Sequence, residues 1–175
     1  RPARVADVTQ ATHRPDGCGS EDCHPGIHNF VWGPDGGLYV QESVFHHTQV
    51  ETIYGPRRSK DNAIYRFDPR THRLEIVSRL PPGGNPWGYA INRWGEHLYV
   101  ARHNSASLIN QPESGNVAND SYGNRDNRNC GQEFISSRHW PDEFQGKVFS
   151  NQYKNFQGVL LHDWTENGTT YDHKR

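Results

Sequence analysis

The segment CGSEDCHPGIH at residues 18–28 places two cysteines and two histidines close together in the sequence. Cys18-x4-Cys23-His24 looks like a stretched haem-attachment motif, whose usual form is C-x-x-C-H. The four-residue spacer and the following Pro25-Gly26 pair, which disfavours a helix, argue against haem at this position. We therefore expect a disulfide, either a Cys18–Cys23 loop or a Cys23–Cys130 bridge.

Histidines suited to proton transfer recur along the first third of the chain. Imidazole has a pKa near neutrality, so it can take up or release a proton at physiological pH. The candidate catalytic residues are His24, His28, His46 and His47. Two alternatives stay open at this point. In one, His24, His28 and one of the other two bind a metal ion, and in the other the imidazoles only hydrogen-bond to loop backbone.

Charged and aromatic residues near these histidines are candidates for binding a substrate or cofactor. They are Glu42, Arg58, Trp87, Arg102 and His103. An indole such as that of Trp87 stacks on a planar ligand or a sugar ring, although packing between sheets would use it equally well. Glu42 also has two interpretations, a site carboxylate at a strand end or a solvated loop carboxylate.

The elements that must position these residues are β-hairpins of two kinds. The first kind has two short apolar runs around a glycine-containing turn and occurs at residues 29–40, 88–100 and 133–149. The second kind occurs at residues 63–77, with a turn at Asp68-Pro69, and at residues 158–171, with a turn at Asn167-Gly168. One hairpin of each kind makes a four-stranded antiparallel unit, which is typical of a β-propeller blade.

We therefore expect an all-β fold, a partial β-propeller of two to three four-stranded antiparallel blades. The first blade spans about residues 28–79, and the first two strands of a second blade span about 88–103. An Asn-rich insertion follows at about 104–129, and two further hairpins occupy about 133–171. So few blades leave sheet edges open, so we expect the single domain 1–175 to be a fragment of a larger closed propeller. A compact β-sandwich is the alternative.

Blade topology sorts the connecting loops between the two ends of a propeller. The turns inside the hairpins lie at one end, and here most of them are short. The loops that precede the first strand and join the second to the third lie at the other end, and they are long and hold the candidate histidines. Binding and catalysis concentrate in such loops on a rigid scaffold. The sequence thus predicts that the candidate residues gather at one end of the fold.

Composition and charge exclude several classes of protein. The formal net charge is −1 and the pI about 6.9, without a basic stripe, so nucleic acid is not an expected partner. The sequence has no run of about 18 apolar residues, so we expect no membrane contact from this segment. Hydrophobic residues make up only 32%, yet 5 Trp, 8 Tyr and 7 Phe argue against a disordered chain.

Three stretches together carry a resemblance to a known family. They are GSEDCHPGIHNFVWGPDGGLYVQESVFHHTQVET at 19–52, NPWGYAINRWG at 85–95 and EFISSRHWPDEFQGKVFSNQYKNFQGVLLH at 133–162. In order and content they resemble the PVC-type haem-binding CxxCH proteins, which are also labelled membrane-bound dehydrogenases. The resemblance implies an N-terminal propeller similar to those of the soluble quinoprotein glucose and sorbosone dehydrogenases.

The resemblance also implies a function. It suggests a periplasmic or secreted bacterial protein that oxidises a sugar or an alcohol and passes electrons to a haem c domain outside this chain. Pyrroloquinoline quinone and calcium are the implied cofactors, with His24 or His28 and Arg58 or Arg102 as the corresponding types of group. Asn92 stands where the family motif has aspartate. The alternative is a non-catalytic propeller module that binds a carbohydrate or a protein; in either case the remaining blades belong to the parent protein.

Overall fold

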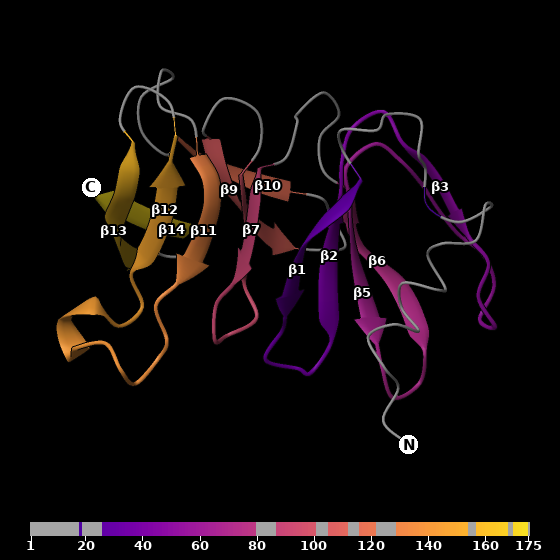
Figure 1. Cartoon of the computed structure of the whole chain (residues 1–175), viewed down its shortest axis with the longest axis horizontal. Coiled ribbons are helices and arrows are strands. Elements are labelled where there is room, and N and C mark those ends of the chain that lie inside the picture. The colour runs from indigo at the N-terminus through magenta and orange to yellow at the C-terminus, as the bar shows by residue number, and fades with distance from the viewer. Residues whose placement is uncertain are drawn as a thin grey trace. The chain divides into compact units, whose positions relative to one another are not determined.

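A computed structural model of the chain describes the backbone of residues 18, 26–79, 87–100, 105–111, 116–121, 129–153, 157–167 and 170–174. Within these ranges the only helix is the short 3-10 helix η2 (Asp142–Phe144), and the other regular elements are strands (Figure 1). The all-β prediction is therefore confirmed. No helix in the described ranges is long and apolar enough to cross a membrane. The chain divides into two compact units, Arg1–Asn85 and Pro86–Arg175.

The first unit contains a four-stranded antiparallel sheet in the order β1-β2-β5-β6. Its strands are β1 (Ile27–Trp32), β2 (Leu38–Glu42), β5 (Ala63–Asp68) and β6 (Arg73–Arg79). Both hairpins predicted in this part of the chain form, and the pairing of β2 with β5 joins them. The β1–β2 turn follows its expected chemistry, because Gly36 has a positive φ of 76°, which favours glycine.

A second, smaller hairpin interrupts the sheet between β2 and β5. Its strands are β3 (His47–Val50) and β4 (Arg57–Lys60), which form an antiparallel two-stranded sheet. We expected this segment to be a loop between the second and third blade strands, so the prediction was incomplete. The strands are four residues long and mostly polar, and such strands give little periodic hydrophobic signal.

The second unit contains two four-stranded antiparallel sheets, each built from consecutive strands. The strands of one are β7 (Gly88–Ile91), β8 (His97–Val100), β9 (Ser105–Gln111) and β10 (Asn116–Ser121). The strands of the other are β11 (Asn129–Phe134), β12 (Val148–Gln152), β13 (Gly158–Asn167) and β14 (Thr170–Lys174). The hairpins predicted at 88–100, 133–149 and 158–171 are present.

The stretch that we expected to be an Asn-rich insertion, about 104–129, differs from the prediction. It supplies β9 and β10, which complete the sheet begun by β7 and β8. Asparagine and serine have low β-propensity, so composition alone favoured a loop. Backbone pairing with β8 overrides that preference, because a neighbouring strand offers every second residue two hydrogen bonds.

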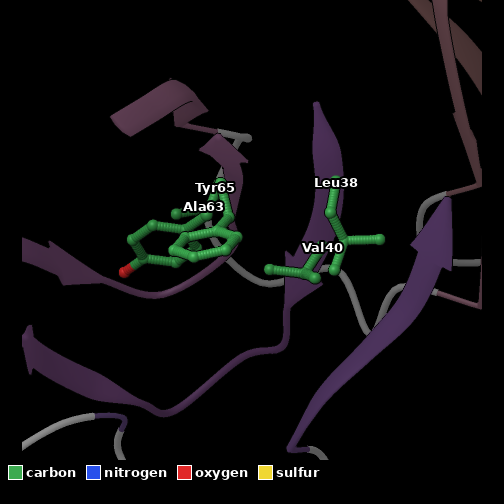
Figure 2. Close-up of a cluster of buried hydrophobic side chains, with 5 residues drawn as sticks. Leu38, Val40, Ala63 and Tyr65 are labelled. Atoms are coloured by element: carbon green, nitrogen blue, oxygen red, sulfur yellow. The ribbon is translucent and has the colours of Figure 1, made fainter. Parts of the chain in front are cut away.

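The core of the first unit lies on one face of the β2–β5 pair. The side chains of this cluster alternate along the two strands, because every second residue of a strand points to the same face. Figure 2 shows Leu38 and Val40 on one strand and Ala63 and Tyr65 on its neighbour. Val40 is the cross-strand partner of Tyr65, and Leu38 is the partner of Phe67. This packing fixes the positions of the C-terminal end of β2 and of the Tyr65 hydroxyl group.

The core of the second unit lies between its two sheets. Ala90 and Leu98 from one sheet form a cluster with Phe134 and Val148 from the other, and Trp164 packs against them. The first strands of the two sheets, β7 and β11, also lie together. Gly88 and Gly131 meet there, and an added Cβ at Gly88 would lie 3.5 Å from the Gly131 Cα. The two sheets therefore pack face to face around small residues at one side and apolar residues in the middle.

Truncation of Leu98 should destabilise the second unit. Leu98 is 0% exposed at the centre of the cluster, so Leu98→Ala should lower the free energy of unfolding by about 2–5 kcal/mol. The matched control is Val159→Ala, since Val159 is 59% exposed on β13 and should change stability by less than about 0.5 kcal/mol. Urea unfolding followed by circular dichroism measures both; equal midpoints for the two variants would contradict the packing described.

Candidate functional site

Polar side chains that are hidden from solvent gather at the end of β2. Gln41, Glu42 and Ser43 are all at most 1% exposed. A polar group removed from water costs free energy unless it is hydrogen-bonded, and a carboxyl group costs the most. The interpretation of Glu42 as a solvated loop carboxylate is therefore wrong. The surrounding residues must instead supply its hydrogen bonds.

Two hydroxyl groups from the small hairpin satisfy the Glu42 carboxyl. The Thr48 hydroxyl donates to Oε1, and the Ser59 hydroxyl donates to Oε2 at 2.6 Å. Thr48 and Ser59 are cross-strand partners, so their side chains share one face of the β3–β4 hairpin. That face is buried, and the residues on either side of them point the other way. The hairpin thus presents a pair of hydroxyls to a single carboxyl group.

The network continues from Ser59 to the phenol of Tyr65. The Ser59 and Tyr65 oxygens are within hydrogen-bond distance. Since a serine hydroxyl has one proton and Ser59 donates it to Glu42, Tyr65 must be the donor to Ser59. Burial and the nearby Glu42 charge raise the pKa of Tyr65, which keeps its proton in place. The result is a chain of directed bonds from Tyr65 through Ser59 to Glu42.

Burial also controls the protonation of the two acidic groups beside this chain. It raises the pKa of Glu42, while the hydrogen bonds from Ser59 and Thr48 and the charge of His46 oppose that rise. The Cys18 thiol lies close enough to feel the Glu42 charge, and burial and that charge raise its pKa to about 12. A thiol with this pKa is almost entirely protonated at neutral pH. Cys18 is therefore an unreactive neighbour of Glu42 rather than a nucleophile.

Two of the predicted histidines join Glu42. His46 is 1% exposed and interacts electrostatically with both Glu42 and His28. His28 is only half-buried, and its cross-strand partner is Gln41, so it stands beside the buried network. Burial lowers the pKa of His28, a hydrogen bond with the Asn29 side chain opposes that effect, and the neighbouring His46 lowers the pKa further. His28 is therefore a neutral imidazole at neutral pH, which is the form that accepts a proton.

The bulge beside His28 fixes the direction of its strand. The β1–β2 pairing shifts between His28 and Val31, and Asn29 has a positive φ of 54°. The Asn29 side-chain amide donates to Gln41 Oε1 at 2.8 Å. Gln41 Nε2, by contrast, has no hydrogen-bond partner among the described residues. Bulges re-aim side chains at functional sites, so this one is suited to presenting His28.

Residues with unusual backbone conformations fix the turn that contains His46. Phe45, Asp61 and Asn62 all have positive φ, at 68°, 58° and 47°. Such a φ is uncommon for a bulky residue such as Phe45 and requires support from its surroundings. The Asp61 carboxylate accepts from the Phe45 N–H at 2.6 Å, and the Asp61 N–H donates to the His46 carbonyl at 3.0 Å. The turn that carries His46 is thus tied to the segment after β4.

The other predicted site residues lie elsewhere. His47 and Arg58 occupy the exposed face of the β3–β4 hairpin, opposite Thr48 and Ser59, so they do not meet Glu42. Trp87 belongs to the second unit, where its ring lies 5.9 Å from that of Tyr153. Outside the described residues are His24, Arg102, His103 and Cys23.

The disulfide expectations stay predictions. Cys18 is a free cysteine in the structure. Cys130 lies in β11, where the backbone is described but the side chain is not, and Cys23 is outside the described residues. The structure thus places Cys18 beside Glu42 and leaves the pairing of the other two untested.

The sequence did not indicate three residues of the network. Thr48, Ser59 and Tyr65 surround Glu42, yet each is an ordinary residue in its local sequence. Tyr65 reads as a strand aromatic. The hydroxyls of Thr48 and Ser59 become informative only once HTQV and RRSK are recognised as paired strands, because both then fall at inward positions.

The second unit places a neutral residue at the position that corresponds to Glu42. Gln152 ends β12, the second strand of its sheet, as Glu42 ends β2. Gln152 donates to Ser150 at 3.2 Å, and Ser150 is 2.8 Å from His162 Nε2. These three residues are buried. The buried carboxyl group therefore distinguishes the first sheet from this related arrangement.

The described residues offer no built site for the implied cofactors. They contain no group of three or more histidine, cysteine, aspartate or glutamate side chains placed to hold a metal ion. A quinone with several carboxylates needs cations around it, but Arg58 lies on the face away from Glu42. The part of the chain described here supplies a proton-accepting imidazole without a cationic cradle beside it.

Comparisons with protein-family models, with curated proteins and with solved structures found no match for this chain.

Stability should respond to pH through Glu42. A carboxyl group whose pKa is raised by folding binds more protons in the folded state, so stability is retained at low pH and falls as the pH rises through its folded pKa. Glu42→Gln removes that ionisation, so stability should fall less between pH 5 and pH 8 in the variant than in the parent chain.

Urea midpoints at both pH values measure this difference. His28 contributes the opposite slope, because its lowered pKa makes stability rise with pH, but that contribution is common to both proteins. Glu51→Gln is the matched control, since Glu51 is an exposed carboxylate. An unchanged pH dependence in Glu42→Gln would show that Glu42 ionises in the folded protein without cost.

Proposed function

We propose that this chain is the propeller part of a periplasmic dehydrogenase that oxidises a sugar or an alcohol, with His28 as the base that accepts the hydroxyl proton. Electrons would pass to a haem c domain elsewhere in the parent protein. The observation that carries the catalytic part is the state of His28: half-buried, neutral at neutral pH, and set beside His46 and the Glu42 network. The cellular location and the haem domain rest on the family resemblance.

Sheet organisation supports the propeller. Consecutive strands make each four-stranded antiparallel sheet of the second unit, and the first strands of the two sheets, β7 and β11, pack together. Inner strands of neighbouring propeller blades are arranged in this way around a common axis. The sheet of the first unit has the same strand connections, with the β3–β4 hairpin added between its second and third strands.

The buried network would position the base rather than touch the substrate. Glu42 and His46 are both 1% exposed, so a substrate does not reach them, whereas His28 retains access to solvent. Burial is the main cause of the lowered pKa of His28, the neighbouring His46 adds to it, and Glu42 lies next to His46. The hydroxyl proton would pass to the His28 ring. A bound quinone, for which the described residues provide no cationic site, would supply the acceptor for the hydride.

The test is oxidation of aldoses and polyols by the parent protein loaded with pyrroloquinoline quinone and calcium. Reduction of an artificial electron-accepting dye measures the rate. Some aldose or polyol should support turnover, and His28→Ala should lower kcat by about 10²-fold or more, as loss of a general base does. Because the pKa of His28 is lowered, activity should persist at pH values below the usual pKa of about 6.5 and fall only in more acidic solution.

His47→Ala is the matched control for this test. His47 is the neighbouring predicted histidine, but it lies on the exposed face of β3 and should leave kcat unchanged. If no aldose or polyol supports dye reduction, the dehydrogenase proposal fails. Equal losses in the two variants would remove His28 from the mechanism while leaving the dehydrogenase intact.

The second candidate is a non-catalytic module that binds a carbohydrate or a protein. The specific observation in its favour is the near-complete burial of Glu42 and His46, since a network closed to solvent also serves simply to hold loops together. Under this proposal the function lies on the exposed surface, and dye reduction is absent while ligand binding is retained.

A further inference from the structure

The exposed face of the β3–β4 hairpin carries polar and cationic side chains only. His47 and Gln49 alternate outward along β3, and Arg58 and Lys60 do so along β4. The register pairs His47 with Lys60 and Gln49 with Arg58, so the four side chains form two adjacent rows. Arg79, from β6, borders this group at the edge of β4, because its Nη2 donates to the Arg58 backbone carbonyl at 3.3 Å. We call these five residues the hairpin cationic face.

The permanent charges of this face have no ion-pair partner in the described part of the chain. Arg58, Lys60 and Arg79 form no ion pair with a carboxylate among the described residues. Other arginines of the same unit are paired: Arg66 with Asp35, Arg70 with Asp68, and Arg73 with Glu75. Glu51, which follows β3 directly, accepts from Gln49 Nε2 at 3.0 Å. Within the described residues, Arg58, Lys60 and Arg79 thus differ from Arg66, Arg70 and Arg73, which have carboxylate partners.

Arg58 is held in a defined orientation. Its Nε donates to Gln49 Oε1 at 2.8 Å, which anchors one edge of the guanidinium group. Neither Nη group has a partner among the described residues. A planar guanidinium with two free nitrogens matches the two oxygens of a carboxylate. The anchored fork therefore favours a carboxylate as the ligand group.

The size of the face favours a linear ligand over a protein. A four-residue strand is about 13 Å long, so two of them make a narrow strip. Stable protein interfaces involve about 20–30 residues on each side, far more than this strip presents. Single-stranded nucleic acid binds largely by stacking on several aromatic rings, but the five residues of the face include only one ring, the imidazole of His47. A polysaccharide with regularly spaced charges fits a narrow strip and does not need several aromatic rings for stacking.

We propose that the hairpin cationic face binds a carboxylated polysaccharide, a polyuronate. The ligand would lie along the hairpin, with a carboxylate on Arg58 and neighbouring carboxylates near Lys60 and Arg79. The Gln49 side-chain amide, exposed on the same face, provides a polar group for sugar hydroxyls. This inference specifies a surface and a ligand chemistry for the second candidate function and rests on no part of the dehydrogenase proposal.

The test is binding of polygalacturonate to the full chain at low ionic strength, about 0.01 M, where screening is weakest. The triple variant Arg58→Gln, Lys60→Gln, Arg79→Gln should raise the dissociation constant at least about tenfold. A charge-matched control, Arg70→Ala, Arg93→Ala, Arg138→Ala, removes the same three charges from other exposed positions and should stay within about twofold of the parent. Affinity electrophoresis or titration calorimetry gives the constants, and circular dichroism confirms folding.

A single substitution keeps the proposal falsifiable if the triple variant does not fold. Gln49→Glu places a carboxylate against Arg58, so it should weaken polygalacturonate binding several-fold without removing a cation. Neutral dextran should not bind to any of the proteins. The proposal is overturned if the triple and control variants lose binding equally. Binding of dextran sulfate or duplex DNA at least as tightly as polygalacturonate, or no polygalacturonate binding, overturns it as well.

The polygalacturonate test and the dye-reduction test fail independently. His28 lies in β1 and takes no part in the hairpin cationic face. Loss of polyuronate binding in the triple variant should leave the His28-dependent reaction on a small sugar or alcohol unchanged.

Discussion

A carboxyl group buried at the end of a strand sets the conditions for the first unit. Glu42 is withdrawn from water by the packing of β2 against β5, so its oxygens need donors close at hand. The four-stranded sheet contributes the Ala63 backbone N–H. The chain leaves the sheet, forms the β3–β4 hairpin and returns, and in doing so it brings Thr48 and Ser59 to the two oxygens. The hairpin and the carboxyl group thus depend on each other.

The same network determines what the histidines can do. His46 lies inside it and is 1% exposed, whereas His28 lies beside it and is only half-buried. This separation explains why histidines that look equivalent in the sequence have different surroundings. His47, adjacent to His46, faces outward because side chains alternate along a strand. The alternating direction of side chains along the strand, and not their distance along the chain, decides which of these residues face inward and which face outward.

Much of the fold was predictable, and the reasons are local. Turn chemistry marked the hairpins at Gly36 and at Asp68-Pro69, because those residues favour the required backbone angles. The β9–β10 and β3–β4 hairpins were not predicted, because their strands are polar. Backbone pairing with a neighbouring strand stabilises them rather than burial of apolar side chains. For the site, the sequence indicated Glu42, His28 and His46 by residue type. It did not indicate Tyr65 or the two hydroxyls, since their roles arise only from tertiary register.

The alternation of the hairpin also has a consequence for how this protein tolerates change in length. Inner and outer residues are one position apart, so inserting or deleting a single residue within β3 would exchange its faces. Thr48 would turn to solvent, and His47 or Gln49 would be driven against the Glu42 carboxyl. Substitutions on the outer face carry no such penalty. The fold of the hairpin therefore tolerates substitutions at its outward-facing positions. It does not tolerate insertion or deletion of a residue in β3.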